Sequence, residues 1–147
     1  MNKLLAVLSC PLLLAACAST STSTSQPTGP SANAVMRPAS GSQVHGSVTL
    51  AETGNAVRVN TELAGLPSGL ITLRIHEKGD CSKPDASSTG IFEREIGPLQ
   101  PDEYGKAVVA YTITGTTVSK ASGGLLGKGM VVQAGKERIA CGSIDLS

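Results

Sequence analysis

Short runs in which apolar and polar residues alternate make up most of the chain after residue 43. Side chains at alternate positions of a β-strand point to opposite faces, so this period of two predicts strands with one buried face. The first run places Val44, Val48 and Leu50 together on one face. We expect further strands at residues 57–63, 70–77, 106–113, 129–133 and 138–144.

Turn residues separate these runs. Gly54 and Asn55 lie between the first two, and such a pair is typical of the tight turn of a β-hairpin. The pattern contains no amphipathic helix of useful length. We therefore predict an all-β fold, an antiparallel sandwich or barrel. Its core must consist mainly of Val, Ile, Leu and Ala, because the 147 residues include no Trp, one Phe and two Tyr.

The first 16 residues are interpreted as an export signal. Lys3 precedes an apolar stretch that is too short for a permanent membrane helix, which needs about 20 residues. The stretch ends in Leu14-Ala15-Ala16-Cys17, which resembles the lipobox of bacterial lipoproteins. The resemblance implies cleavage after residue 16, acylation of Cys17 and a lipid anchor in the cell envelope. Ala18 after the cysteine favours the outer membrane, facing the periplasm. An ordinary secretory signal with a chance cysteine is the alternative.

Composition changes after the signal. Residues 17–42 are rich in Ser, Thr, Pro, Gly and Ala and contain few bulky apolar residues. Such a segment cannot bury enough surface to offset the entropy lost on ordering. We therefore interpret residues 17–42 as the lipidated cysteine and a flexible tether, and residues 43–147 as the folded domain.

Charge and cysteine content narrow the function. The 12 basic and 11 acidic residues give a net charge of +1, which argues against nucleic acid as a partner because phosphate binding needs a concentrated basic surface. If Cys17 carries lipid, Cys81 and Cys141 remain after processing. In an oxidising compartment this pair is expected to form a disulfide. Two buried free thiols are the alternative.

Several motifs occur along the domain in a fixed order. Residues 65–69 read Gly-Leu-Pro-Ser-Gly, residues 75–82 read Ile-His-Glu-Lys-Gly-Asp-Cys-Ser, and residues 84–88 read Pro-Asp-Ala-Ser-Ser. Near the end, residues 125–132 read Leu-Leu-Gly-Lys-Gly-Met-Val-Val and residues 138–142 read Arg-Ile-Ala-Cys-Gly. Through these motifs the domain resembles the copper/zinc superoxide dismutases over nearly all of its length.

This resemblance implies a specific fold and assembly. The family has an eight-stranded Greek-key β-barrel, and Cys81 and Cys141 fall where its intrasubunit disulfide falls. Family members also often form homodimers through the barrel, so a homodimer is one expectation for this chain.

The metal ligands of that family are largely missing here. The family holds copper with four imidazoles, one of them shared with zinc, and holds zinc with two more imidazoles and an Asp. This chain has two histidines in all, and only His76 matches a copper-ligand position. The loops that carry the zinc histidines and guide the anion are shortened to residues 93–96 and 134–137. Four matching ligand positions hold other residues, namely Arg74, Ile91, Pro98 and Gln133.

Two polar residues of the domain are therefore given structural interpretations. A lone imidazole beside Arg74 is a poor metal site, so we expect His76 to be a partly exposed residue on the outer face of the sheet. Arg138 matches the arginine that steers the anionic substrate in the family. Without copper beneath it Arg138 has no anion to steer. We therefore expect its side chain to form a structural contact or an ion pair with a carboxylate.

The sequence contains no other recognisable arrangement of catalytic residues. Glu93 and Glu95 are spaced to share a face, but on a loop they are interpreted as solvated carboxylates. The glycine-rich residues 123–128 lack the spacing of a phosphate-binding loop and are interpreted as a tight turn. His45 is expected to face solvent.

These observations favour a binding or structural module over an enzyme. In this interpretation a catalytically dead superoxide dismutase-like domain, with no catalytic residue, metal or cofactor, is displayed on a lipid anchor for an envelope partner. The first alternative is a weak copper-binding protein that uses His76 with His45, Met36 or Met130, because imidazole and thioether groups can hold Cu(I). The second is a dismutase with atypical ligands.

Overall fold

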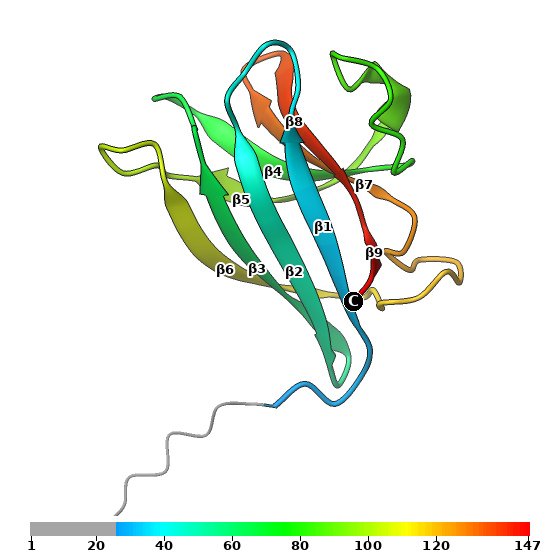
Figure 1. Cartoon of the computed structure of the whole chain (residues 1–147). Coiled ribbons are helices and arrows are strands. Elements are labelled where there is room, and N and C mark those ends of the chain that lie inside the picture. Colours follow the sequence, from blue (N-terminus) through cyan, green and yellow to red (C-terminus); the bar gives the residue numbers. More distant parts are fainter. Residues whose placement is uncertain (1–25) are drawn as a thin grey trace, which may run out of the picture.

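The computed structural model describes residues 26–147, and the predicted signal peptide, Cys17 and the first part of the predicted tether lie outside them. The described chain forms one antiparallel sheet that curves into a nearly closed barrel (Figure 1). This confirms the all-β prediction and the barrel architecture. Residues 26–147 contain no α-helix, and therefore no helix able to cross a membrane.

Strands and one short 3-10 helix follow each other along residues 26–147. They are β1 (Ser31–Pro38), β2 (His45–Thr53), β3 (Ala56–Ala64), β4 (Ile71–His76), η1 (Ser87–Thr89), β5 (Phe92–Leu99), β6 (Ala107–Thr114), β7 (Gly129–Ala134), β8 (Glu137–Ser143) and β9 (Asp145–Leu146). Hydrogen-bonded neighbours follow the order β5-β4-β7-β8-β1-β2-β3-β6, and β9 pairs with β1. The alternation predicted for the strands is confirmed, since one face of each strand from β1 to β8 contributes buried aliphatic side chains to a single core.

The two edge strands, β5 and β6, approach each other without forming a ladder. The Tyr111 hydroxyl of β6 donates a hydrogen bond to the carbonyl of Pro98, and the guanidinium of Arg94 donates to the carbonyl of Thr114 at 3.2 Å. The Tyr111 ring also lies against Gly97, where a Cβ atom would come within 2.6 Å of ring carbons. Side chains therefore close the seam that backbone hydrogen bonds leave open.

Strand β1 corrects the predicted domain boundary. Ser31 to Met36 pair with β2, and Arg37 and Pro38 pair with β8. The flexible tether predicted up to residue 42 is therefore wrong for residues 31–38. The physical reason is that small residues on alternate positions, Ala32 and Ala34, are fully buried and allow the backbone to sit close to the core.

Strand β5 corrects a second expectation. Residues 93–96, predicted as a loop, lie within β5, where Arg94 and Glu95 pair with β4. The pairing contains two register shifts, one between Leu73 and Arg74 and one between Ile75 and His76. Such bulges place an extra residue on one strand and break the period of two, which hides the strand from a reading of the alternation.

The disulfide between Cys81 and Cys141 is confirmed, with 5.8 Å between the two Cα atoms. Cys141 lies in β8, next to Arg37 of β1 in the strand register. Cys81 lies in the segment between β4 and β5. The bond therefore ties this segment to the centre of the sheet. The shortened loop expected at residues 134–137 is also as predicted, since β7 and β8 are separated only by Gly135 and Lys136.

A chain that begins at Gln43 should fail to fold, because removal of β1 leaves β2 and β8 without their shared neighbour and opens the core. A chain that begins at Gln26 keeps every described strand and serves as the control. Circular dichroism and urea unfolding of the two truncations check this. A cooperative unfolding transition for the chain that begins at Gln43, with a midpoint equal to the control, would show that β1 is dispensable.

Substitution of Cys81→Ser should lower the free energy of unfolding by about 4 kcal/mol. The disulfide spans 60 residues, and in the chain-entropy model a closed loop of this length restricts the unfolded chain by about that amount. Urea unfolding under oxidising conditions measures the change, and Cys141→Ser should give the same loss because it removes the same bond. An unchanged midpoint would mean that the bond does not stabilise the domain.

Candidate functional site

The positions that match the family's metal ligands lie on and around the outer face of β4, where a covering segment, residues 77–91, folds over the sheet. Backbone hydrogen bonds close this segment at its base. The Glu77 N–H donates to the carbonyl of Ile91 at 3.0 Å, and the Lys78 N–H donates to the carbonyl of Thr89 at 2.9 Å. The helix η1 lies within the segment. The sheet and its cover together define the candidate site.

His76 lies at the end of β4 beneath the covering segment. Its side chain is only 2% exposed, so the prediction of a partly exposed histidine is wrong. The alternation placed His76 on the outer face correctly, but the covering segment shields that face from solvent. Nδ1 lies 3.2 Å from the carbonyl oxygen of Gly90 and donates to it in the neutral ring. Nε2 is buried and has no hydrogen-bond partner within residues 26–147.

The surroundings of His76 favour the neutral imidazole. Burial is the largest cause and lowers the pKa of His76 below its ordinary value, although the hydrogen bond to Gly90 acts in the opposite direction. The positive charges of Arg138 and Arg74 lower the pKa further, and the carboxylate of Glu93 raises it by a smaller amount. The site therefore disfavours an additional positive charge at the imidazole.

Arg138, on β8, fastens the covering segment to the sheet. Its guanidinium donates to the carbonyl of Ala86 at 2.9 Å, to Oγ1 of Thr89 at 2.7 Å and to the carbonyl of Gly90 at 3.1 Å. A planar guanidinium presents several donors in a fixed fork, which suits this set of converging oxygens. Arg138 thus has the structural role that the sequence predicts, through neutral oxygens of the segment.

The covering segment has an uncommon backbone conformation at Ala86, one of the residues that Arg138 contacts. Ala86 has a φ of 54°, in the left-handed region that L-residues other than Gly adopt at a cost of roughly 1–2 kcal/mol. Its side chain is fully buried against the disulfide, and its carbonyl receives the hydrogen bond from Arg138. The disulfide and the guanidinium together stabilise this conformation.

Arg74 lies at the position that matches the family's first copper histidine, and its side chain contacts two residues of β5. Its guanidinium pairs with Glu95 at 3.3 Å, and its guanidinium carbon lies 5.1 Å from the centre of the Phe92 ring. The Phe92 ring also meets the His76 ring edge-on, with 6.1 Å between centroids. Sequence reasoning missed this aromatic contact, although the charge and the ring are both visible in the sequence.

The two glutamates interpreted as solvated carboxylates lie on β5 and not on a loop. Each has its own cation, since Glu95 pairs with Arg74 and Glu93 pairs with Nζ of Lys128 at 2.7 Å from one carboxylate oxygen. The predicted turn at residues 123–128 consists of two tight turns, in which the Gly124 N–H donates to the carbonyl of Ala121 at 2.8 Å and the Lys128 N–H donates to the carbonyl of Leu125 at 3.2 Å. The two carboxylates are therefore parts of structural ion pairs.

The remaining predicted positions do not converge on His76. Gln133 lies opposite Thr72 in the strand register, and its side-chain amide donates to the carbonyl of Gly135 at 3.1 Å. Pro98 is paired with the same Thr72 from the other side. Ile91 is exposed at the base of the covering segment. The structure therefore assembles His76 with arginines and an aromatic ring.

The ligand set of the copper-binding alternative is dispersed as well. His45 is exposed on β2, as predicted, and its Nδ1 lies 2.8 Å from the carbonyl of Gln43. Met36 and Met130 are buried in the core, and Met130 lies opposite Ile75, on the other face of the sheet from His76. Within residues 26–147 no group of three or more His, Cys, Asp or Glu side chains is placed to hold a metal ion. The residues present do not fit the family's copper or zinc.

Comparison with known proteins identifies the domain type. The chain is 39% identical over 77 residues to the copper/zinc superoxide dismutase of Caulobacter vibrioides. This match covers 49% of the chain and 44% of that relative, so it spans less than half the length of the curated relative. No protein-family model matches the chain.

Solved structures share the fold over most of the domain. Two single-residue mutants of Candida albicans superoxide dismutase 5 superpose on the chain with a TM-score of 0.68 each. Their sequence identities are 23% and 21%, and the superpositions cover 80% and 82% of this chain and 92% of each of those chains. At this identity the likeness establishes the fold, and function has to be argued from the site.

The buried His76 should make the domain less stable in mild acid. Its pKa is lowered from 6.5 in the folded state, so the unfolded chain binds more protons below about pH 6.5 and stability falls as the pH drops toward the lowered value. Urea unfolding between pH 8 and pH 5 should show this loss, and His76→Leu should reduce it. His45→Leu is the matched control and should retain it. An equal acid-side loss in His76→Leu would assign the effect to another group.

Proposed function

We propose that this chain, which carries a copper/zinc superoxide dismutase-like domain, is a binding or structural module of the cell envelope and not a dismutase. The observation that carries the proposal is how the covering segment is held. Arg138 and the disulfide attach it to β8 through three hydrogen bonds and one covalent bond. The segment that would surround a metal is therefore secured by the protein's own side chains.

The donor chemistry of the site supports the same proposal. Copper that cycles between two oxidation states needs a nitrogen-rich ligand set to hold it and to tune its potential. Around His76 the chain offers two guanidinium groups, which have no lone pair to donate and which repel a metal cation. We therefore propose that the domain carries neither copper nor zinc as a resident cofactor.

Attachment to a membrane is the second part of the proposal. The lipobox resemblance at Cys17 supports a lipid anchor, and the disulfide is consistent with an oxidising compartment such as the periplasm. The described chain enters the barrel beside the β2–β3 turn, where Oγ1 of Thr28 accepts a hydrogen bond from the Gly54 N–H at 3.2 Å (Figure 1). In this arrangement the opposite end of the barrel, with the exposed side chains of Leu70 and Tyr104, faces away from the anchor and toward a partner.

The proposal predicts that the chain does not retain metal. The full chain, purified in detergent, is loaded with copper and zinc, dialysed, and measured for metal content by mass spectrometry and for superoxide dismutation. We expect far less than one metal ion per chain and no dismutation above that of the free metal remaining in the buffer.

Two variants make this experiment decisive. His76→Ala removes the buried imidazole, and His45→Ala is the matched control at the exposed histidine. One copper per chain that is lost in His76→Ala and kept in His45→Ala would overturn the proposal and establish a copper site at His76. Dismutation that depends on the same residue would establish the dismutase alternative.

A further inference from the structure

Three segments meet toward the end of the barrel where the described chain enters. They are the entry residues 26–30, the β2–β3 turn at residues 53–56 and the β6–β7 connection at residues 115–128 (Figure 1). Glu52 joins them, because its carbonyl accepts hydrogen bonds from the N–H groups of Thr28 and Gly29, both at 3.2 Å. Its carboxylate accepts another from the Val118 N–H at 2.7 Å. We call the three segments together the entry tip.

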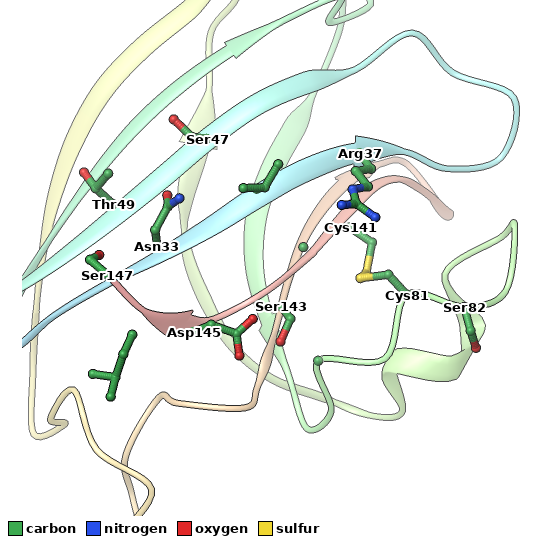
Figure 2. A pocket seen from close by; sticks show the side chains of 14 residues that line it. Asn33, Arg37, Ser47, Thr49, Cys81, Ser82, Cys141, Ser143, Asp145 and Ser147 are labelled. Carbon is green, nitrogen blue, oxygen red and sulfur yellow. A yellow bond between two sulfur atoms is a disulfide. The ribbon is translucent and has the colours of Figure 1, made fainter.

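The free charge of the entry tip is positive. The only charged residues in its three segments are Lys120 and Lys128. Lys128 pairs with Glu93, whereas Lys120 is exposed and forms no ion pair within residues 26–147. Two carboxylates of the same half of the barrel lie outside the tip. Asp145 lines a wide groove on the outer face of β1 (Figure 2), and Glu77 lies at the base of the covering segment.

A pocket of about 190 Å³ adds a second cation beside the entry tip. It lies between β5 and the β6–β7 connection, and its charged lining residues are Glu93, Arg94 and Lys128. Glu93 neutralises Lys128, but Arg94 forms no ion pair within the described residues, so the pocket keeps one uncompensated positive charge. The Arg94 guanidinium donates one hydrogen bond, to the carbonyl of Thr114, and has further N–H donors.

The charge and size of this pocket suit the phosphate of a lipid headgroup. A phosphodiester carries one negative charge, which matches the single uncompensated cation, and its oxygens accept hydrogen bonds from a guanidinium. The pocket volume equals that of about six water molecules, at about 30 Å³ each, which is room for a small polar group.

The length of chain before the barrel places the entry tip near an acylated Cys17. Thr28 lies eleven residues after Cys17, so the chain between them spans at most about 40 Å. A strand of nine residues such as β2 is about 30 Å long, so the opposite end of the barrel lies further from the anchor. Confinement to this range raises the effective concentration of the tip at the membrane, so that contacts too weak to hold a free domain suffice.

We propose that the entry tip docks on an anionic lipid surface, with Lys120 among the headgroups and a headgroup phosphate in the pocket beside Arg94. Basic side chains close to such a membrane are attracted by its negative surface potential. This inference rests on the lipid anchor of the proposed function, and it adds which face of the domain lies on the membrane. The opposite end, with Leu70 and Tyr104, stays free for a partner.

The test uses the full lipidated chain in vesicles whose lipids carry a nitroxide quencher at the headgroup. An encoded fluorescent amino acid replaces Ser122, which is exposed on the entry tip. We expect quenching at position 122 to be roughly twofold stronger in vesicles that contain phosphatidylglycerol than in pure phosphatidylcholine, because the attraction requires anionic lipid. The same fluorophore at Tyr104, at the opposite end, is the matched control and should stay unquenched. Equal quenching at the two positions would overturn the docking.

Charge removal tests the two cations. In phosphatidylglycerol vesicles, Lys120→Gln and Arg94→Gln should each weaken quenching at position 122, and the double variant should lower it to the level of pure phosphatidylcholine. Lys106→Gln removes an exposed cation at the opposite end and should change nothing. Because Lys120 is exposed and forms no ion pair, Lys120→Gln keeps the test valid even if Arg94→Gln disturbs the seam. Unchanged quenching in Lys120→Gln would contradict the proposal.

Flotation of the chain with the vesicles reports on the anchor separately. The chain should float, and Cys17→Ser should abolish flotation. A chain that does not float with Cys17 intact would refute the lipid anchor and the docking together. A chain that floats while position 122 stays unquenched would refute the docking alone.

Discussion

The attachment of the covering segment to β8 is the constraint on which the site depends. Cys141 and Arg138 lie three residues apart on this strand, and they hold the segment by a covalent bond and by three hydrogen bonds. Burial of His76, the left-handed backbone of Ala86 and the position of Gly90 all follow from this attachment. Because the guanidinium is satisfied by neutral oxygens, its positive charge remains uncompensated nearby and acts on the imidazole.

The protein's own side chains hold the covering segment and β5 in place. A metal ion often organises loops because it gathers ligands from several elements. Here a guanidinium gathers oxygens from the same covering segment, and the ion pairs Arg74–Glu95 and Glu93–Lys128 connect β5 to its surroundings. The core of aliphatic side chains is separate from these contacts. The fold and the chemistry of the site are therefore supported by different sets of residues.

Much of the fold was predictable because alternation is a local signal. From His45 onward it located every strand except β5 and β9, together with the buried face of each, and it located the turn at Gly54. It failed at β1, where Ala32 and Ala34 carry the buried face without looking like a core, and at β5, where bulges break the period. In the candidate site, the sequence was enough to single out Arg74, His76 and Arg138. It was not enough to predict which residues contact them. His76 is buried by a segment that extends up to 15 residues away in sequence. The alternation indicates which face of the strand a residue is on, but it does not indicate what packs against that face.

The position of β1 has a consequence for how the molecule is made. This first strand of the described chain lies between β2, its neighbour in sequence, and β8, which is far from it in sequence. A long loop must close before β1 and β8 can pair. Such non-local pairing is slow because the chain loses entropy on loop closure before the stabilising contacts form. Until residues near Cys141 have emerged, β1 can have only one of its two partners and the wall of the barrel remains open. The wall of the barrel can therefore close only after β8 has been synthesised, and any factor that accompanies the chain during synthesis meets it with an unpaired strand edge.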